Sequence, residues 1–488
     1  MNDRTSPGEH HQQLPRCDRK PLAPSDLPGP KGLPLLGNFL QLDLKRLHTV
    51  LESWAEVYGS LYTIRLGRRP VVVVSDPVLV NEALRDRPEG YRRISAIERV
   101  QNEIGLGGVF SAEGEQWRRQ RPMVNQALNP QHLRTFYQTL LLITEKLMNR
   151  LQRYAASDNA VAVQDDLMRF TVDATTNLAF GYDVNTLESE DDVIQQHLQK
   201  IFPMISRRVN AAFPYWHFIR LPADRALEKA LIEIRKAIAG FVEHSRARIA
   251  ANPDLEEHPG NLLEAMLVAR DESKFRFSDP EIMGNVLTML LGGEDTTANT
   301  LAWMLYFMTE FPEVQTRMQA EADTVLGGNK LLYEYANHDQ LKYIEAAAFE
   351  TMRLKSVAPL LFLETNRDRK LGPISLAKGA TVFLLLRHCG LQESSFGKAG
   401  QFKPERWLQP DGSRITPHNS GACMPFGAGA RFCPGRNLAM LEIKSAMAML
   451  CRNFSFSRNP GGPAVDEEFA FVMTPKNLSV RIRYRDKK

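Results

Sequence analysis

The residue with the clearest chemistry in this sequence is Cys433, which lies in the glycine-rich segment Phe426–Gly435, F-G-A-G-A-R-F-C-P-G. A helical apolar pattern follows from Asn437 to about Arg452, so the cysteine precedes an amphipathic helix. A thiol at such a helix end, two residues after Arg431, is expected to have a lowered pKa, which favours the thiolate. A lone thiolate suits the single axial bond of a haem iron better than zinc, which usually takes four ligands. The alternative is a buried structural cysteine in a glycine turn.

A second chemically capable group lies in Leu291–Thr297, L-G-G-E-D-T-T. It falls within a long predicted helix that begins at the capping-box sequence Ser278–Glu281 and continues to about Glu310. Two adjacent glycines inside a helix cost roughly 1 kcal/mol each relative to alanine, and we interpret them as making room for a flat ligand and O2. Asp295 and Thr296 place an acid beside a hydroxyl and can pass protons into that space. The alternative is a solvent-facing polar turn.

Two further pairs have spacings that bring their side chains together on helices. Trp117 and Arg121 are four residues apart and share one helix face, where an indole N–H and a guanidinium suit the carboxylates of a ligand. An exposed arginine-rich face is the alternative. Glu350 and Arg353 are three residues apart, and Arg406 follows in P-E-R-W. Such a pair contributes little to stability when it is exposed. When it is buried, it is destabilising unless it is fully hydrogen-bonded.

Together these segments resemble the cytochrome P-450 family. The family pattern Phe-x-x-Gly-x-Arg-x-Cys-x-Gly is matched at each fixed position from Phe426 to Gly435. The distal-helix pattern Ala/Gly-Gly-x-Asp/Glu-Thr is matched from Gly292 to Thr296, and Trp-x-x-x-Arg and Glu-x-x-Arg are also present. The likeness covers the chain from about Leu27 to its end.

The resemblance implies a haem-thiolate site that holds haem b. It implies that Cys433 is the metal ligand and that Asp295 and Thr296 are the catalytic acid–alcohol pair. The other cofactor-binding residues that it implies are Trp117, Arg121, Arg431, Phe426 and Gly435. It also implies a structural triad behind the cysteine loop, composed of Glu350, Arg353 and Arg406.

The chain departs from the family pattern in three places after the Glu-x-x-Arg motif. Ser356 stands where proline is usual, and Gly390-Leu391-Gln392 stands in place of His-Arg-Asp. Leu363 replaces an arginine that often contacts a haem propionate. This leaves one propionate contact open, for which Arg387 or His388 is a candidate replacement.

The predicted fold is mainly α with small β-sheets, and the resemblance implies haem between a long distal helix and the helix after the cysteine loop. Residues 1–26 are polar and proline-bearing, which predicts a disordered N-terminal segment, and residues 27–488 are predicted to form a single catalytic domain. Leu61–Leu66 and Val71–Val74 predict a hairpin with a loop of about four residues. Gly90–Phe110 has no clear period and is predicted to be an irregular loop, which at this length is usually functional or disordered. The resemblance implies that this region covers the distal side of the haem and contacts substrate.

Composition narrows the class of protein. The 488 residues carry a net charge of +4 without obvious clustering, which gives no reason to expect nucleic-acid binding. The five scattered cysteines argue against a disulfide framework and for a reducing compartment. No apolar run approaches the roughly 20 residues of a membrane helix. We expect a soluble, bacterial-type cytoplasmic enzyme without a transmembrane anchor. The aromatic stretch Phe213–Pro222 predicts either core packing or a lid whose aromatics contact a membrane surface peripherally.

The predicted function is a haem-thiolate monooxygenase that inserts one oxygen atom from O2 into a hydrophobic small molecule. Only 55 residues follow Cys433, so we expect no fused reductase and a separate ferredoxin- or flavodoxin-type electron donor. This donor is predicted to dock on the cysteine side, through Arg436, Lys444 and Arg118 or Arg119.

The expected pocket is largely apolar, with walls from residues 90–110, 202–218, the Gly292 region and residues 360–363. Two enzyme alternatives need no external electrons: a peroxide-driven haem-thiolate hydroxylase and a haem-thiolate isomerase. A third alternative is a non-catalytic haem sensor or carrier, against which the acid–alcohol pair and the lid-like loop argue.

Overall fold

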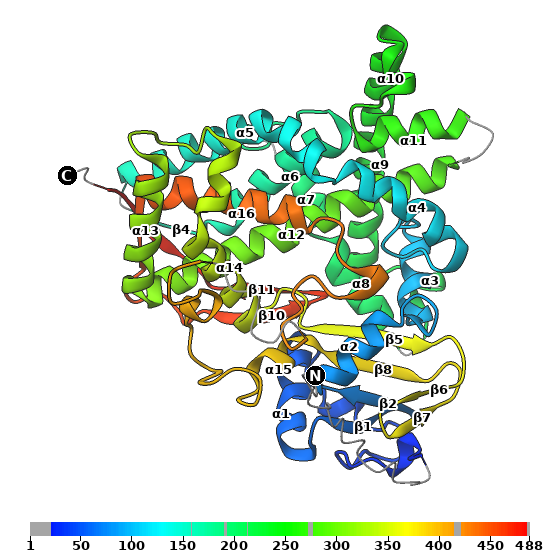
Figure 1. The fold of residues 1–488 in the computed structure, drawn as a ribbon. Helices are drawn as coiled ribbons and strands as arrows, with labels where there is room; N and C mark the ends of the chain where they lie inside the picture. The colour runs from blue at the N-terminus through cyan, green and yellow to red at the C-terminus, as the bar shows by residue number, and fades with distance from the viewer. Residues whose placement is uncertain are drawn as a thin grey trace, which may run out of the picture.

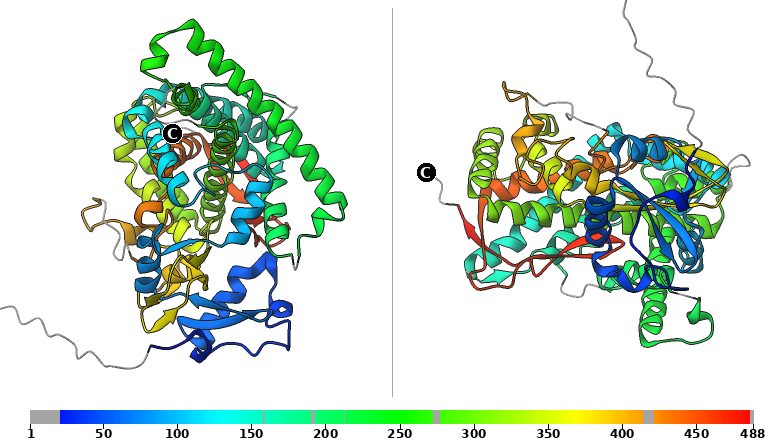
Figure 2. Two further views of the ribbon diagram at one scale, coloured as in Figure 1. Left: turned by 90° about the vertical axis from the view of Figure 1, so that its right-hand side faces the viewer. Right: turned by 90° about the horizontal axis from the view of Figure 1, so that it is seen from below.

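The structure, a computed structural model, describes residues 21–485 except for 158, 190–192, 212, 272–276 and 414–420. Helices make up most of the molecule, and a sheet containing the first strands lies at one end (Figure 1). The two further views show the same arrangement (Figure 2). The prediction of a mainly α fold with small sheets is confirmed. The disorder prediction for residues 1–20 lies outside the described residues, and within 21–26 the Leu22 N–H donates to Pro373 O at 2.9 Å.

The described residues contain α-helices of very different lengths. Their bounds are α1 Leu47–Tyr58, α2 Pro77–Arg85, α3 Ser95–Glu103, α4 Gly114–Ala127, α5 Pro130–Ser157, α6 Gln164–Phe180, α7 Val193–Leu198, α8 Ile201–Val209, α9 Pro222–Ala251, α10 Asp254–Glu257, α11 Leu262–Asp271, α12 Asp279–Glu310, α13 Pro312–Leu326, α14 Lys342–Leu354, α15 Leu386–Leu391 and α16 Arg436–Asn453. Short 3-10 helices are η1 Pro24–Asp26, η2 Phe39–Gln41, η3 Leu44–Arg46, η4 Tyr215–His217, η5 Tyr335–Gln340, η6 Pro404–Trp407 and η7 Gly429–Arg431.

The strands form one five-stranded sheet and three smaller ones. Their bounds are β1 Leu61–Leu66, β2 Arg69–Val74, β3 Tyr91–Arg93, β4 Ala160–Val161, β5 Leu360–Thr365, β6 Arg369–Leu371, β7 Ile374–Leu376, β8 Thr381–Leu385, β9 Phe454–Arg458, β10 Asp466–Ala470, β11 Val472–Lys476 and β12 Val480–Tyr484. The large sheet has the order β1-β2-β8-β5-β3, in which β2 and β8 are parallel and the other pairs antiparallel. The small sheets have the orders β4-β12-β9, β10-β11 and β6-β7.

Helix α12 is the central helix of the α region. Ser278 is its N-cap, and the reciprocal bonds between Ser278 and Glu281 form the predicted capping box. Most of its side chains are buried, and it packs against α6, α14 and α16. A helix that is apolar on nearly all sides is stable only when neighbours surround it. This position in the core fixes the Gly-Gly-Glu-Asp-Thr segment relative to α16 and the cysteine loop.

Two local predictions were wrong. The hairpin turn between β1 and β2 contains only Gly67 and Arg68, because Arg69 and Pro70 already pair with β1. Residues 90–110 are not irregular throughout, since they contain β3 and helix α3. The buried side chains Ile97 and Val100 have the spacing of one helix face, and the glycines that follow them obscure this short pattern.

Candidate active site

The cysteine loop is shaped by backbone conformations that require glycine. Gly427 and Gly429 have φ angles of 74° and 69°, in the left-handed region that other residues rarely adopt. A Cβ on Gly429 would lie 2.7 Å from the Cα of Arg85, so this turn packs directly on the end of α2. The Cys433 N–H donates to Phe426 O at 2.9 Å and closes the loop. Gly435 is then the N-cap of α16, as the sequence predicted for the helix after the cysteine.

The environment of the Cys433 thiol differs from the prediction. Backbone N–H groups of Gly435 and Arg436 donate to the sulfur, and Arg121 is the nearby cation. These groups favour the thiolate, but burial outweighs them and raises the pKa of Cys433. The expectation that the pKa of Cys433 is lowered was therefore wrong for the protein without a bound metal. A thiol that coordinates a metal is nevertheless deprotonated, because the metal charge outweighs the cost of burial.

Arg431 does not face the thiol. Its guanidinium donates to Glu113 Oε2 at 2.5 Å and to Ala112 O at 2.7 Å, and it lies 4.4 Å from the centre of the Trp117 ring. Arg121, one turn after Trp117 on α4, donates instead to Phe432 O in the cysteine loop. The structure thus brings Trp117, Arg121 and Arg431 together beside Cys433.

Two arginines that the sequence analysis missed, Arg87 and Arg93, belong to the same group. Arg87 is buried, with its Nη2 3.9 Å from Glu113 Oε1. The Arg93 backbone N–H donates to that carboxylate at 3.1 Å, and its guanidinium lies 3.7 Å from the centre of the Phe110 ring. Burial, with repulsion from Arg87, lowers the pKa of Arg93 to about 9. The Arg-Arg doublet that follows Tyr91 was the available sequence signal.

Arg93 also bears on the departure at Leu363. The two residues are directly opposite each other in the antiparallel pair of β3 and β5. Directly opposite residues of an antiparallel pair point to the same face, so the neighbouring strand places Arg93 beside Leu363, whose side chain is buried in an apolar cluster. Arg387 is bound instead by Glu52 and Glu467, and His388 by Glu56. The suggested replacement by Arg387 or His388 was wrong, because both side chains are committed elsewhere.

The donor set fits a large anionic ligand. Among the described residues, the buried Trp117 Nε1 and the Nε atoms of Arg87, Arg121 and Arg431 have no hydrogen-bond partner. Glu113 is the carboxylate that the structure pairs with Arg431 and Arg87. Buried unpaired donors and surplus positive charge are unfavourable in the protein alone. The two carboxylates of a haem would supply the missing acceptors and negative charge.

On α12, the two glycines of the motif have different roles. A Cβ on Gly292 would meet nothing within 4 Å, so open space adjoins this position. A Cβ on Gly293 would lie 2.2 Å from Thr175 Oγ1, so Gly293 is required by the packing of α6. The interpretation that both glycines make room for a ligand was therefore wrong for Gly293. Only Gly292 adjoins free space on the helix face.

The predicted acid–alcohol pair lies beside this space. Thr296 Oγ1 donates to Gly292 O at 2.8 Å, which leaves the hydroxyl oxygen able to accept a further hydrogen bond. Asp295 is buried, and burial raises its pKa to about 7. An acid with such a pKa changes protonation state near neutral pH, as proton transfer requires.

The Glu-x-x-Arg pair is a fully connected buried cluster. Arg353 Nε and Nη2 donate to the two oxygens of Glu350 at 2.8 and 2.7 Å, and its Nη1 donates to Gly390 O and Ala399 O at 2.7 Å. Arg406 and Trp407 also donate to Glu350, at 2.8 and 2.9 Å. A Cβ at Gly390 would lie 2.9 Å from Arg353 Cγ, which accounts for glycine at one departure from the family pattern.

The aromatic stretch near residue 215 fits in part both interpretations that the sequence offered, which were core packing and a lid with exposed aromatic side chains. Trp216 is buried, and its Nε1 donates to Glu103 Oε2 at 2.8 Å, which joins η4 to the end of α3. Phe213 and Phe218 are 60% and 80% exposed. The exposed rings leave an apolar surface beside a segment that is fixed to one predicted pocket wall.

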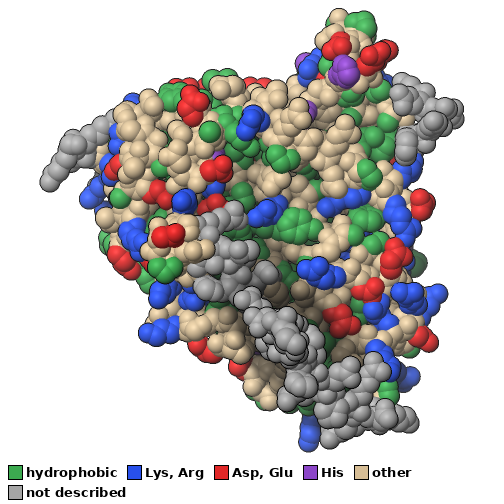
Figure 3. All heavy atoms as spheres, viewed as in Figure 1, with side chains coloured by type: hydrophobic (Ala, Val, Ile, Leu, Met, Phe, Trp, Pro, Cys, Tyr) green, Lys and Arg blue, Asp and Glu red, His purple; other side chains and the backbone are tan. Residues whose placement is uncertain are grey.

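The predicted donor-docking residues differ in accessibility. Lys444 is buried, and its ammonium binds Glu345 Oε2 at 2.7 Å, so its assignment to a docking surface was wrong. Arg118 remains exposed but pairs with Glu89 and Glu115, and Arg119 pairs with Glu281. Lys and Arg are interspersed with Asp and Glu on the face in Figure 3, apart from the surface covered by grey atoms. This face carries no large patch of a single sign among the described residues.

Comparison with known proteins assigns the family. The model of the cytochrome P450 family matches residues 27–482, so the chain belongs to this family. It is 29% identical to the human mitochondrial 25-hydroxyvitamin D-1 alpha hydroxylase over 96% of this chain and 94% of that protein. It is 27% identical to cytochrome P450 27C1 of Danio rerio, with 99% and 90% coverage. It is 25% identical to a bifunctional cytochrome P450/NADPH--P450 reductase of Gibberella moniliformis, spanning 40% of that protein's length.

Family membership makes the protein a haem b oxygenase whose iron is bound through a cysteine thiolate. Among the described residues, no helix has the length and apolar character needed to cross a membrane.

Proposed function

We propose that residues 27–488 form one catalytic domain that inserts a single oxygen atom from O2 into an apolar organic substrate. The observation that carries this proposal is the group of buried, unpartnered donors around Trp117 and Arg431, next to the one loop that matches a haem-ligating cysteine motif. An anionic cofactor would supply the acceptors that these donors lack among the described residues. The open space at Gly292, beside Asp295 and Thr296, supports catalysis rather than simple storage of haem.

Each site residue has a specific part in this proposal. Cys433 binds the iron, and Phe426 and Gly435 shape the loop that presents the sulfur. The residues that hold the carboxylates of the haem are Trp117, Arg121 and Arg431, with Arg87 and Arg93 beside them. When bound, haem supplies the activation of O2 and the transfer of one oxygen atom to a C–H bond or a double bond.

The protein controls proton supply on the other side of the site. With a pKa of about 7, Asp295 can take a proton from the interior and release it again near neutral pH. Thr296 is held by Gly292 O, so its oxygen keeps a fixed position from which it accepts a hydrogen bond from a water or substrate hydroxyl. The pair therefore favours O2-dependent turnover over a peroxide-driven reaction or isomerisation.

The substrate class is inferred from aromatic side chains. Phe110 and Phe202 belong to two predicted pocket walls, and the structure adds Phe471, which packs against both. Phe362 packs edge-on against Phe383 in the sheet. Such a surface suits a lipid, a terpenoid or another hydrophobic metabolite. The human relative is named for hydroxylation of 25-hydroxyvitamin D, a hydrophobic substrate of that protein.

The electron donor in this proposal is a separate ferredoxin- or flavodoxin-type protein. The chain covers 94% of the human relative and 90% of the fish relative, and neither protein is named as a fusion with a reductase. Arg436, at the start of α16, and the exposed Arg118 are the candidate docking residues that remain after Lys444 is excluded. A cytoplasmic location belongs to the same proposal.

The test begins with the ferric Soret band of the haem-loaded protein, titrated with a library of lipids and terpenoids. A spin shift identifies a ligand, which is then incubated with O2 and a ferredoxin–reductase pair, or with hydrogen peroxide alone. The proposal predicts a product that is one oxygen atom heavier, and much faster turnover with the redox partner. Faster turnover with peroxide would favour the peroxide-driven hydroxylase. A spin shift without any product under either condition would favour a carrier or sensor.

A further inference from the structure

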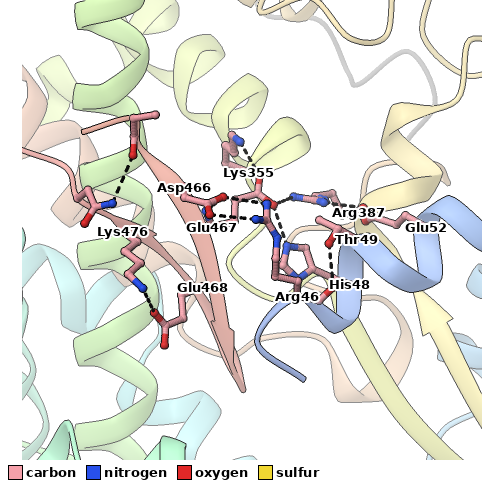
Figure 4. Close-up of polar contacts among 12 residues, drawn as sticks. Arg46, His48, Thr49, Glu52, Lys355, Arg387, Asp466, Glu467, Glu468 and Lys476 are labelled. Carbon is pink, nitrogen blue, oxygen red and sulfur yellow. Dashed lines mark hydrogen bonds and ion pairs between the residues drawn. The ribbon is translucent and has the colours of Figure 1, made fainter. Parts of the chain in front are cut away.

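A set of ion pairs joins the hairpin β10–β11 to the start of α1, far away in the sequence (Figure 4). Three consecutive acids on β10 take part. Asp466 binds Arg46 through two hydrogen bonds of 2.8 and 3.0 Å, Glu467 binds His48 at 2.8 Å, and Glu468 binds Lys45 at 2.9 Å. Neighbouring residues of a strand point to opposite faces, so Glu467 lies on the face opposite to that of Asp466 and Glu468.

Glu467 is the least exposed of the three acids, with 11% of its side chain accessible, and it is the centre of the network. Its two carboxylate oxygens bind Lys355 Nζ at 2.5 Å, Arg387 Nη1 at 2.8 Å and His48 Nε2 at 2.8 Å. These partners come from the end of α14, the start of α15 and α1. Burial alone would raise the pKa of Glu467, but the His48 hydrogen bond and the charges of Arg387 and Lys355 hold it well below its usual range. Glu52 on α1 binds the other side of Arg387 and extends the network.

The connection reaches the distal helix as well. The Lys355 ammonium lies 4.8 Å from the centre of the Trp303 ring on α12. Close by, the Met473 N–H on β11 donates to Val357 O at 2.9 Å. The base of the hairpin therefore reaches α12 through Lys355 at the end of α14, and Met473, two residues after the tip, binds the segment that follows α14. Helices α12 and α14 carry the acid–alcohol pair and the Glu-x-x-Arg pair.

The tip of the hairpin has an unfavourable backbone conformation. Phe471 is the single residue between the two strands and has φ of +79°, in a region that a bulky L-residue rarely adopts. Its ring stacks on Phe202 with the centroids 5.1 Å apart and the planes at 11°, and it meets Phe110 edge-on at 6.0 Å. Such a conformation persists only when the surrounding structure imposes it. Side-chain stacking at the tip, the Met473–Val357 hydrogen bond near it and charge pairing at the base all restrain the hairpin.

We propose that Glu467 is a positioning residue that sets the place of Phe471 in the aromatic wall of the substrate pocket. The carboxylate fixes the base of the hairpin to three elements, and the stiff antiparallel ladder carries this restraint to the tip. Loss of the charge frees the hairpin to move relative to α12, and Phe471 then no longer presents its ring to a ligand. This inference rests on the proposed function, since it concerns the pocket of a haem enzyme.

Two azole probes separate ligand binding from the integrity of the haem site. Imidazole and 4-phenylimidazole both bind a ferric haem through nitrogen and shift the Soret band, but only the second places an aromatic ring in the pocket. Glu467→Gln keeps the size and removes the charge. We expect the Kd for 4-phenylimidazole to rise five- to tenfold and that for imidazole to change less than twofold. Glu468→Gln, the matched control on the same strand, is expected to leave both constants within twofold, because its partner Lys45 is 70% exposed.

A double-mutant cycle with Phe471→Ala tests whether Glu467 acts through Phe471. In the Phe471→Ala background, Glu467→Gln should change the 4-phenylimidazole Kd less than twofold, because the positioned ring is already absent. Equal weakening of both azoles, or additive effects in the cycle, would overturn the inference. If Glu467→Gln does not fold, Lys355→Gln takes its place, since Lys355 is 24% exposed and supplies only one of the bonds. A wild-type protein that loads no haem, or that gives no Soret shift with imidazole, would instead contradict the proposed function.

Discussion

The protein contains two arginine clusters with buried donors, and they differ in how these donors are used. In the Glu350–Arg353 cluster, each nitrogen of the Arg353 guanidinium has a carboxylate or carbonyl acceptor within 3.1 Å. In the cluster around Arg431, the Nε atoms of Arg431, Arg121 and Arg87 have no partner among the described residues. The first cluster is complete within the chain, whereas the second is complete only with an added anion.

The presence or absence of acceptors for the buried donors therefore distinguishes a structural charge from a functional one. A fully hydrogen-bonded ion pair restrains the chain, and removing one partner exposes a buried charge to an apolar interior. A cluster with surplus donors lowers the stability of the empty protein and gains from the ligand that neutralises it. Mutations in the first cluster should therefore lower the stability of the protein, whereas mutations in the second should lower its affinity for the cofactor.

Glu350→Gln should have the largest effect on stability. It removes the acceptor shared by Arg353, Arg406 and Trp407, and we expect a loss of about 3–5 kcal/mol in the free energy of unfolding. Urea unfolding of the protein, followed by circular dichroism, measures this loss. Glu115→Gln is the control, because this acid is 87% exposed and its removal should change stability by less than about 1 kcal/mol. Equal effects of the two variants would contradict the structural role of the first cluster.

Asp295→Asn should stabilise the protein, with a defined pH dependence. The pKa of Asp295 is about 7 in the folded protein against 3.8 in the unfolded chain, so the folded state binds the proton more tightly. Wild-type stability should therefore fall as the pH rises from about 4 to 7, because burial opposes the charged form. The variant lacks this loss, so its advantage should be absent near pH 4 and full above pH 7. Thermal unfolding across this range measures it, and turnover with O2 should fall in the same variant.

Arg431→Met should show most clearly that the two clusters have different roles, because it should affect haem affinity much more than stability. We expect haem affinity to fall about 10- to 100-fold, since a charge-assisted hydrogen bond contributes about 1.5–3 kcal/mol. The stability of the haem-free protein should change by less than about 1 kcal/mol, because repulsion from Arg87 disappears together with the Glu113 pair. Haem transfer to a scavenging globin measures affinity. Arg118→Met, at an exposed position, should leave the transfer rate unchanged.

Trp117→Phe should give the smallest effect, and it should lower haem affinity as Arg431→Met does. The indole N–H has no partner in the described protein, so its removal should not lower the stability of the haem-free form. One hydrogen bond from the neutral indole to a carboxylate of the haem corresponds to about 1.5 kcal/mol, the lower end of the range for a charged acceptor, or roughly tenfold in haem affinity. A drop in haem-free stability of several kcal/mol would show that the indole has a packing role instead.

The sequence was informative where a motif determines a backbone shape and uninformative where it only places a charge. The glycines around Cys433 and the capping box before α12 predicted the loop and both helices at nearly their observed bounds. The direction of a long side chain was not predictable, since Arg431 turns to Glu113 and Lys444 to Glu345. Those partners are distant in sequence, and the choice between them depends on packing that no local pattern encodes.

The same limit applies to Arg93 and Phe471. The importance of Arg93 arises from its position opposite Leu363, which is known only once strand register is known. Phe471 lies in a hairpin near the C-terminus and meets Phe110 and Phe202 only after the chain has folded. Gly292 and Gly293 look alike in the sequence, and only the presence of Thr175 distinguishes them.

The order of strands in the large sheet has a consequence for how the chain folds. The apolar part of strand β2, Val71–Val74, pairs in parallel with β8. Helices α2 to α14 lie between these two strands in the chain. Closing so long a loop is slow and entropically unfavourable, so this pairing forms late, after the helices have begun to associate. During synthesis one edge of the β1–β2 hairpin stays unpaired until the chain has grown past residue 385. An exposed valine-rich edge is prone to intermolecular pairing, so the yield of folded protein should depend on synthesis rate and chaperones more than on the final stability of the sheet.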